Sequence, residues 1–323
     1  MLPEISIYQL KNQNENEWFT CADINEKDEI LCGTDQGIIY QTHSPSDQNQ
    51  STYKQLIGSK MKSSFGKKQS FFFDILGHRK LISDICYYDP HGCYILSCSA
   101  DNDLRLWSSS SSTCRTIYRS HLSPIWCLAV HAKSDRFASG SMDQTVRLWT
   151  PERNHILRTF VHHTNEINTV AFHPNGKYLA SGSTDGLIIL WAMEQAQPAR
   201  IFPSSFPVEQ LTFTSDGNQL ISMNSNLEQK SDQINLWDIR TAQQLELIKN
   251  IPSHRRLLKS CQIETTNKFL TGFNKSLLCF HLHTTVEETK NSSFRTELSS
   301  KSMIQRLIHL SSRQANQCIA IVE

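Results

Sequence analysis

Serine, histidine and aspartate recur at fixed spacings along this chain, and these residue types can form the triad of a nucleophilic hydrolase. Each copy also ends in a tryptophan, which gives three sets of four residues, here called tetrads: His78, Ser97, Asp101 and Trp107; His121, Ser139, Asp143 and Trp149; and His163, Ser181, Asp185 and Trp191. A catalytic triad needs to occur once, at an accessible site, whereas three copies at one spacing indicate a structural repeat. We therefore predict that the tetrads are structural, that no residue is catalytic, and that the protein is not an enzyme.

The tryptophans reveal the period of the repeat, because Trp107, Trp149, Trp191 and Trp237 follow one another at steps of 42, 42 and 46 residues. One period contains four short stretches with strand-like character, at residues 125–130, 136–141, 145–149 and 156–160. A polar turn precedes the third stretch of each copy, at residues 100–102, 142–144 and 184–186. Strands this short and this closely spaced leave no room for helices, so the sequence predicts an all-β chain.

This period, with its strands and tetrads, resembles the WD40 repeat family, in which each repeat of ~40–45 residues forms one blade of a propeller. The resemblance implies that the histidine, serine, aspartate and tryptophan of one blade form a buried chain of hydrogen bonds. The chemistry of the four groups allows it. An indole N–H only donates, a hydroxyl donates and accepts, an imidazole bridges, and a carboxylate accepts.

The remaining blades are degenerate but can be located by spacing. In the first, Asp35 opens the turn and Gln41 takes the tryptophan position. In a later one, Asn274 takes the aspartate position and Phe280 the tryptophan position. Two final strands, at residues 303–310 and 318–322, lack a third, which the strand at residues 5–10 can supply. We predict a seven-bladed WD40 β-propeller closed by pairing of the N-terminal strand with the C-terminal strands. It is predicted to be a single domain of residues 1–323, with residues 42–70 as a polar insertion in the first blade.

Composition excludes several classes of function. The 323 residues carry 32 Lys and Arg against 31 Asp and Glu, so bulk binding of polyanions is excluded and contact with nucleic acid is expected to be indirect at most. The longest apolar run, Leu187 to Met193, is far shorter than the ~20 residues that span a bilayer. The first residues show no signal-peptide pattern, and the ten cysteines include no CxxC pair. We expect a reduced, intracellular protein with no membrane contact.

A finer resemblance concerns the propeller family of TBP-associated factor five. It rests on the opening LPEISIYQL, the ILGH of residues 75–78, the run from Leu157 to Trp191, and the ending KSMIQRLIHLSS of residues 301–312. This resemblance implies a nuclear scaffold of transcription factor IID or of the SAGA co-activator that binds histone-fold TBP-associated factors. It implies no cofactor and no small-molecule substrate. Family members carry a helical region ahead of the propeller, whereas here Met1 leads directly into the first strand, so the functions of that region are not carried over.

An alternative function comes from the string Trp237-Asp238-Ile239-Arg240. It resembles the motif with which WD40 substrate receptors bind the linker of cullin-type ubiquitin ligases. If Asp238 and Arg240 both point outward from a strand, they can pair with a partner. We keep a ligase substrate receptor as the alternative.

The surface for partners is predicted from the loops that join blades and the turns that precede third strands, which converge on one face of a propeller. Met142 is the most informative residue, because an apolar side chain at a turn tip has nothing to bury against in its own blade. The predicted partner-binding residues are Arg79, Lys80, Met142, Asn165, Glu166, Thr184, Arg255 and Arg256.

Three other features are better explained by a solvated surface. They are the lysines of the 42–70 stretch, the five serines of residues 108–112, and the pair His281 and His283. The histidine pair has no third ligand nearby in the sequence, so we predict no metal site.

Overall fold

The structure is a computed structural model, and it describes residues 4–9, 19–25, 29–43, 54–57, 77–89, 91–131, 135–214, 216–226, 231–252, 261–263, 268–273, 276–281, 298–299, 304–309 and 317–322. These residues form strands, turns and bends and include no helix, so the predicted all-β class is confirmed for them. Within the same ranges there is accordingly no helix long and apolar enough to cross a membrane.

The chain divides into two compact units, a large unit of residues 12–208 and a small unit of residues 1–11 and 209–323. The large unit contains four sheets, each of four strands that pair in chain order. The first two sheets are β2 (Phe19–Ile24), β3 (Glu29–Thr34), β4 (Ile39–His43) and β5 (Lys54–Ile57), then β6 (Ile82–Tyr87), β7 (Tyr94–Ser99), β8 (Asp103–Ser108) and β9 (Thr113–Arg119). The next two are β10 (Ile125–His131), β11 (Arg136–Ser141), β12 (Thr145–Thr150) and β13 (Arg153–Val161), then β14 (Ile167–Phe172), β15 (Tyr178–Ser183), β16 (Leu187–Ala192) and β17 (Gln197–Pro203).

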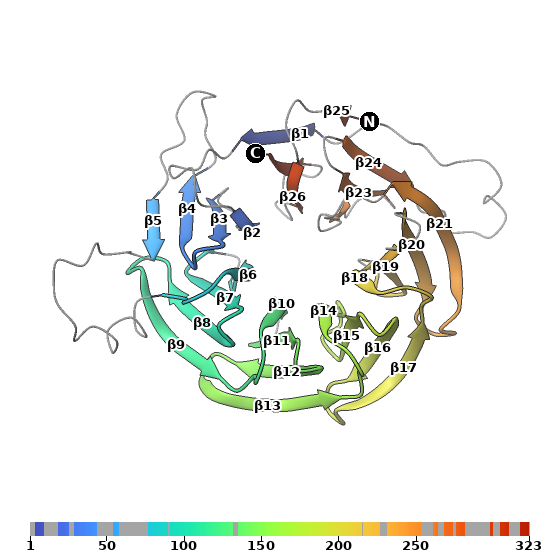
Figure 1. Ribbon diagram of the computed structural model, residues 1–323, viewed down its shortest axis with the longest axis horizontal. Coiled ribbons are helices and arrows are strands. Elements are labelled where there is room, and N and C mark those ends of the chain that lie inside the picture. Colours follow the sequence, from blue (N-terminus) through green and yellow to red (C-terminus); the bar gives the residue numbers. More distant parts are fainter. Residues whose placement is uncertain are drawn as a thin grey trace. The chain divides into compact units, whose positions relative to one another are not determined.

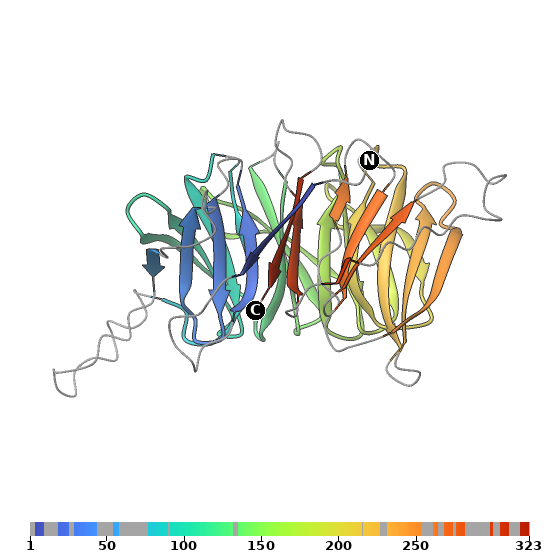
Figure 2. The same cartoon turned by 90° about the horizontal axis from the view of Figure 1, so that it is seen from above.

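The strands of one sheet differ in burial according to their place in it. The third strand β8 has four consecutive buried residues, 104–107, because neighbouring sheets cover both of its faces. The outer strand β13 is mostly exposed, and Phe160 is its one fully buried side chain. Figure 1 shows β9, β13 and β17 along the outside of the large unit. Seen from the side in Figure 2, the strands of this unit run between two opposite edges.

The turn before each third strand has a residue in the left-handed backbone region. Asn102, Gln144 and Gly186 hold equivalent places there, with φ of 70°, 69° and 80°. The N–H group of each donates to the carbonyl three residues earlier. This conformation is strained for most residues, and glycine and asparagine tolerate it best.

The first sheet has the same turn, and Asp35 opens it as predicted. Gly37 has φ of 80° and donates to the carbonyl of Thr34, as Gln144 does to that of Ser141. The residue before Gly37 therefore occupies the aspartate position. That residue is Gln36, so the aspartate position lies one residue after Asp35.

The tryptophan position of the first sheet shifts in the same way. Ile30 on β3 lies opposite Thr42 on β4, as Phe137 lies opposite Trp149 in the third sheet. Thr42 therefore takes the tryptophan position, and the prediction of Gln41 is wrong. Spacing could not show this, because no tryptophan marks the register in this sheet and only backbone pairing reveals it.

Residues 42–70, predicted as a polar insertion, contain strand residues. Residues 42–43 end β4, and Lys54–Ile57 form β5, which pairs antiparallel to β4. The polar composition of the stretch hid this strand, because an outer strand is covered on fewer sides and needs fewer apolar residues. The other residues of the stretch lie outside the described ranges.

The small unit contains the remaining strands in three sheets. They are β18 (Val208–Phe213), β19 (Gln219–Asn226), β20 (Ser231–Asp238) and β21 (Gln244–Pro252); β22 (Cys261–Ile263), β23 (Lys268–Phe273), β24 (Ser276–His281) and β25 (Leu298–Ser299); and β1 (Glu4–Gln9), β27 (Gln317–Val322) and β26 (Ile304–His309). The pairing of the N-terminal strand with a C-terminal strand is observed, since β1 runs parallel to β27 from Glu4 opposite Gln317 to Gln9 opposite Val322.

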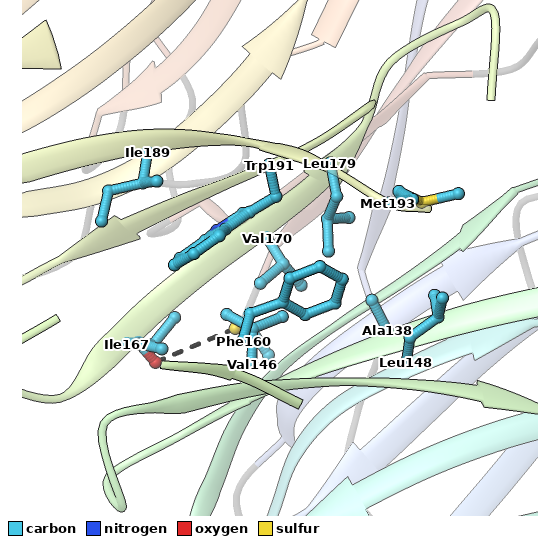
Figure 3. Packing of buried hydrophobic residues seen from close by; sticks show 11 residues of the cluster. Ala138, Val146, Leu148, Phe160, Ile167, Val170, Leu179, Ile189, Trp191 and Met193 are labelled. Carbon is cyan, nitrogen blue, oxygen red and sulfur yellow. Dashed lines mark hydrogen bonds between the residues drawn. The ribbon is translucent and has the colours of Figure 1, made fainter. Parts of the chain in front are cut away.

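Aromatic contacts join successive sheets of the large unit. Phe160 of β13 packs against Trp191 of β16, with ring centroids 5.3 Å apart, at the centre of the cluster in Figure 3. Tyr118 of β9 packs in the same way against Trp149 of β12, at 5.6 Å. Each of these outer strands thus supplies one aromatic side chain to the tryptophan of the next sheet, and burial of such a side chain contributes about 1.5–3 kcal/mol.

A small residue on the second strand lets adjacent sheets approach closely. A Cβ atom on Gly140 would lie 2.6 Å from both the Cys127 Sγ and the Ile167 Cγ2, and Ile167 belongs to the next sheet. In the second sheet the equivalent residue is Cys98, opposite Asp84. The Asp84 carboxylate accepts from the N–H groups of residues 85 and 128 there, which directs it toward backbone rather than toward a second-strand side chain.

We expect Gly140→Ala to lower the free energy of unfolding by about 1–3 kcal/mol, because the added methyl group overpacks the contact between two sheets. Urea unfolding at equilibrium measures this. Part of the loss should be recovered in a Cys127→Ala background, where one of the two close contacts is gone. An equal cost of Gly140→Ala in both backgrounds would contradict the packing explanation.

Candidate functional site

The third sheet contains a complete chain of hydrogen bonds through its tetrad. The Trp149 indole N–H donates to the Ser139 Oγ at 2.9 Å, and that oxygen lies 2.7 Å from the His121 Nε2. The His121 Nδ1 lies 2.8 Å from an Asp143 carboxylate oxygen. One arrangement satisfies all four groups: indole to hydroxyl, hydroxyl to Nε2, and Nδ1–H to carboxylate.

The second and fourth sheets repeat this geometry. In the second, Trp107 donates to Ser97 at 2.8 Å, and His78 lies 2.8 Å from Ser97 and 3.0 Å from Asp101. The distances of the fourth sheet are 2.8, 2.7 and 2.9 Å, for the pairs Trp191–Ser181, His163–Ser181 and His163–Asp185. The structure therefore brings together all twelve residues of the predicted tetrads.

The serines of these tetrads have no access to a substrate. Ser97, Ser139 and Ser181 are each 0% exposed, and each hydroxyl already accepts from an indole. A nucleophile must reach the reacting carbonyl, so this geometry supports scaffold rather than catalysis for all three. Among the described residues there is also no group of three or more His, Cys, Asp or Glu side chains suited to a metal ion.

Burial and hydrogen bonding shift the pKa values of the tetrad histidines and aspartates in opposite directions. Burial lowers the pKa of His121, although its hydrogen bond to Asp143 raises it in part. Burial alone would raise the pKa of Asp143, but hydrogen bonds from His121, Thr145 and the backbone of Leu122 bring it below its usual range. The pKa shifts of the other two pairs have the same directions. The native tetrad is thus a neutral imidazole beside a carboxylate.

The tetrad aspartates also hold the chain where it enters each sheet. Backbone N–H groups of Arg79, Leu122 and Thr164, each the residue after a tetrad histidine, donate to Asp101, Asp143 and Asp185 at 2.9–3.1 Å. The turn before the third strand is joined to the same segment. The N–H of Met142 donates to the carbonyl of Pro124 at 2.9 Å, and residue 184 does so to residue 166 at 3.1 Å.

We call the edge formed by these segments the turn edge: residues 79–81, 100–102, 122–124, 142–144, 164–166 and 184–186 of the large unit. It contains six of the eight residues predicted to bind partners. Arg79, Lys80, Met142 and Asn165 are exposed there, and Glu166 and Thr184 are partly exposed. The other two, Arg255 and Arg256, lie outside the described residues.

Sequence reasoning missed two residues at or beside this edge. Leu122 is 82% exposed, more than Met142 at 50%, and both side chains flank Asp143. Trp126 is partly exposed, and its indole N–H donates to a Glu166 carboxylate oxygen at 3.0 Å, which joins the third sheet to the fourth. The sequence alone could have pointed to Leu122, because it is an apolar residue directly after the tetrad histidine. The other two copies have Arg79 and Thr164 at this place.

The sheet β18–β21 keeps only part of the tetrad. Trp237 still donates to Ser222 at 3.0 Å, and Asn224 accepts from Ser222 and from Asn235, at 2.8 Å each. Asp238, which follows Trp237, accepts the N–H groups of residues 240 and 241 at 2.8 Å with one carboxylate oxygen and so stabilises its own turn. Arg240, the other residue of the ligase hypothesis, is exposed in this turn.

We expect Asp143→Ala to lower the free energy of unfolding by about 1–3 kcal/mol, because it leaves the His121 ring and backbone N–H groups without an acceptor in the interior. Denaturant unfolding at neutral pH measures the loss. Asp135→Ala is the matched control, since Asp135 is exposed, and it should change stability by less than about 0.5 kcal/mol. Equal effects of the two substitutions would contradict the role of the tetrad.

Stability should fall as the pH drops below about 6.5, the ordinary pKa of histidine, because unfolded chains then bind protons that the buried His78, His121 and His163 do not. The tetrad aspartates, whose pKa values are lowered, add a further loss only below about pH 4. Unfolding titrations between about pH 7.5 and about pH 5.5 test the histidine contribution. His121→Asn should make the pH dependence shallower, and the exposed-site control His155→Asn should not. A slope unchanged by His121→Asn would contradict this assignment.

Comparison with known proteins agrees with the repeat seen in the large unit. Residues 69–108, 112–150 and 154–192 match the family model described as WD domain, G-beta repeat.

Two relatives match shorter stretches. The Drosophila melanogaster protein named "Protein will decrease acetylation" is 39% identical to this chain over 56 residues, which are 17% of this chain and 7% of that protein. Striatin homolog of Dictyostelium discoideum is 37% identical over 70 residues, 20% of this chain and 8% of that protein. The matches therefore span less than a tenth of either relative. From residue 69 to residue 192, this chain is similar to three consecutive WD40 repeats.

Proposed function

We propose that this protein is a non-enzymatic scaffold subunit of a nuclear transcription co-activator complex and that it binds histone-fold TBP-associated factors through the turn edge. WD40 repeats mediate protein–protein interactions, and the three repeats supply that general role. The observation that carries the proposal is the pair Leu122 and Met142, two exposed apolar residues that are both joined to one tetrad aspartate, Leu122 by its backbone N–H and Met142 as the preceding residue. Exposed apolar side chains, methionine among them, are typical of a protein interface.

The proposed ring has seven blades. The described strands form seven sheets, six of four strands and one of three, and β1 joins the two ends of the chain by pairing with β27. Closure of a ring in this way removes open sheet edges, which would otherwise pair with other chains. This supports a propeller closed by the N-terminal strand.

Two further observations support the transcription role. The resemblance to the TBP-associated factor five family extends over four separate segments in order, from residue 2 to residue 312. The name of the Drosophila relative refers to decreased acetylation. Histone acetylation is what the resemblance implies for the SAGA branch, so we favour that branch and a nuclear location.

Affinity purification of the tagged chain from nuclear extract, followed by mass spectrometry, tests the function. We expect histone-fold TBP-associated factors together with acetyltransferase subunits. The double variant Leu122→Glu/Met142→Glu should reduce their recovery about tenfold, as expected when the centre of an interface is lost. Leu245→Glu is the matched control, since Leu245 is an apolar residue, 45% exposed, on β21, which is not part of the turn edge, and it should leave recovery unchanged.

Three results would contradict the proposal. One is recovery of these factors by the double variant at the level of the original chain. Another is recovery of a cullin and its linker that Arg240→Ala abolishes, which would establish the ligase receptor instead. The third is a folded chain that recovers no transcription subunit.

A further inference from the structure

A second surface of the large unit has a basic and apolar character that the turn edge does not explain. It consists of the outer strands β9, β13 and β17, which Figure 1 shows one after another along the outside of this unit. Their sequences, TCRTIYR, RNHILRTFV and QPARIFP, contain five arginines and no aspartate or glutamate. We call the exposed side chains of these three strands the outer band.

Two of the arginines occupy the same place in consecutive sheets. Arg158 lies opposite Leu148, and Arg200 lies opposite Leu190, in each case the residue before a tetrad tryptophan. Each guanidinium donates to the carbonyl of the preceding residue of its own strand, at 3.3 and 3.1 Å. Within the described part of the chain, neither guanidinium pairs with a carboxylate.

The contrast with Arg119 shows that an intramolecular partner is possible on these strands. Arg119 of β9 donates to Asp103 at 3.2 Å, although its side chain is 55% exposed. Arg119 lies opposite Asp103, and the residues at its place in the two following sheets are Val161, opposite Thr145, and Pro203, opposite Leu187. Arg158 and Arg200 lie opposite leucine residues instead, and both are exposed, so they carry their charge at the surface.

Exposed apolar side chains lie on the same strands. Val161 of β13 is 69% exposed, and Ile201 of β17 is 39% exposed. They are two of the five large apolar side chains that are exposed within the described residues, and Leu122 and Met142 of the turn edge are two others. Their strands are already anchored by Phe160 and Phe202, which are fully buried, so packing of the sheets does not require an apolar residue at these exposed places.

The positive charge of the outer band indicates which kind of partner fits it. A second copy of this chain would bring arginine against arginine, and the prolines of β17 at residues 198 and 203 cannot donate in a strand pair. An acidic segment with interspersed apolar residues complements both the guanidinium groups and the apolar side chains. We propose that the outer band binds such a segment of a partner protein, independently of the turn edge.

Binding of short fluorescein-labelled peptides to the full chain, followed by fluorescence anisotropy, tests the proposal. The probe contains glutamate and leucine in a repeating order, and it should bind with an affinity that falls as salt is added. Arg158→Glu/Arg200→Glu should weaken this binding about tenfold or more. The matched control Arg136→Glu/Lys177→Glu makes the same change of charge at two exposed residues, one at the start of β11 and one just before β15, and should bind as the original chain does.

Further probes separate this partner from others. Val161→Ser/Ile201→Ser should also weaken binding of the glutamate–leucine peptide, and replacement of leucine by serine in the peptide should have the same effect. Equal binding of the glutamate–serine peptide would overturn the proposal, because charge alone would then account for it. Equal effects of the two charge-reversed variants would overturn it as well. Binding of a DNA duplex in preference to the peptide would assign the band to nucleic acid instead.

Discussion

The architecture of the large unit depends on a chain of hydrogen bonds in which every buried polar group has a complementary partner. The indole has one donor, the serine hydroxyl accepts it and donates onward, and the neutral imidazole accepts at Nε2 and donates at Nδ1 to a carboxylate. A missing group would leave its neighbours unsatisfied in the interior, which costs more than the net gain of making one hydrogen bond. The chain also joins the segment that enters the sheet, the second strand, and the third strand with the turn before it, so one tetrad holds these parts of a sheet together.

The same chain of bonds explains how the turn edge forms. Because each aspartate accepts from the backbone of the segment that enters its sheet, the entering segments and the turns before the third strands are brought to one edge. Several side chains at that edge, including Leu122 and Met142, are exposed, and at these two residues the hydrogen bonds that join the segments come from the backbone N–H groups. Leucine and methionine at residues 122 and 142 are therefore tolerated in the fold without being required by it, which is the condition for a binding surface.

Sheets without a complete tetrad use other polar contacts. In the first sheet the amide of Gln41 donates to the Tyr87 hydroxyl at 3.4 Å and accepts from Ser109 at 3.3 Å, both in the next sheet. In the sheet β18–β21, Asn224 accepts from the Ser222 hydroxyl, as a histidine does in a complete tetrad, and it also accepts from Asn235. The outer strands contribute differently again, since one buried aromatic residue anchors each of β9 and β13 to the next sheet and leaves their other side chains to solvent. A repeat protein can thus carry separate surfaces at its turns and on its outer strands.

The sequence by itself determined the all-β class, the period, and the twelve tetrad residues, because these follow from residue type and from spacing within one repeat. It also placed six partner-binding candidates on what proved to be one edge. Only the tertiary structure decided the register of the first sheet, where pairing of Ile30 with Thr42 replaces the assignment of Gln41. It alone revealed that Asp238 is used by its own turn, and that Leu122, Val161 and Ile201 are exposed. Register and exposure are set by backbone pairing and by neighbours distant along the chain, and spacing within one repeat carries no record of either.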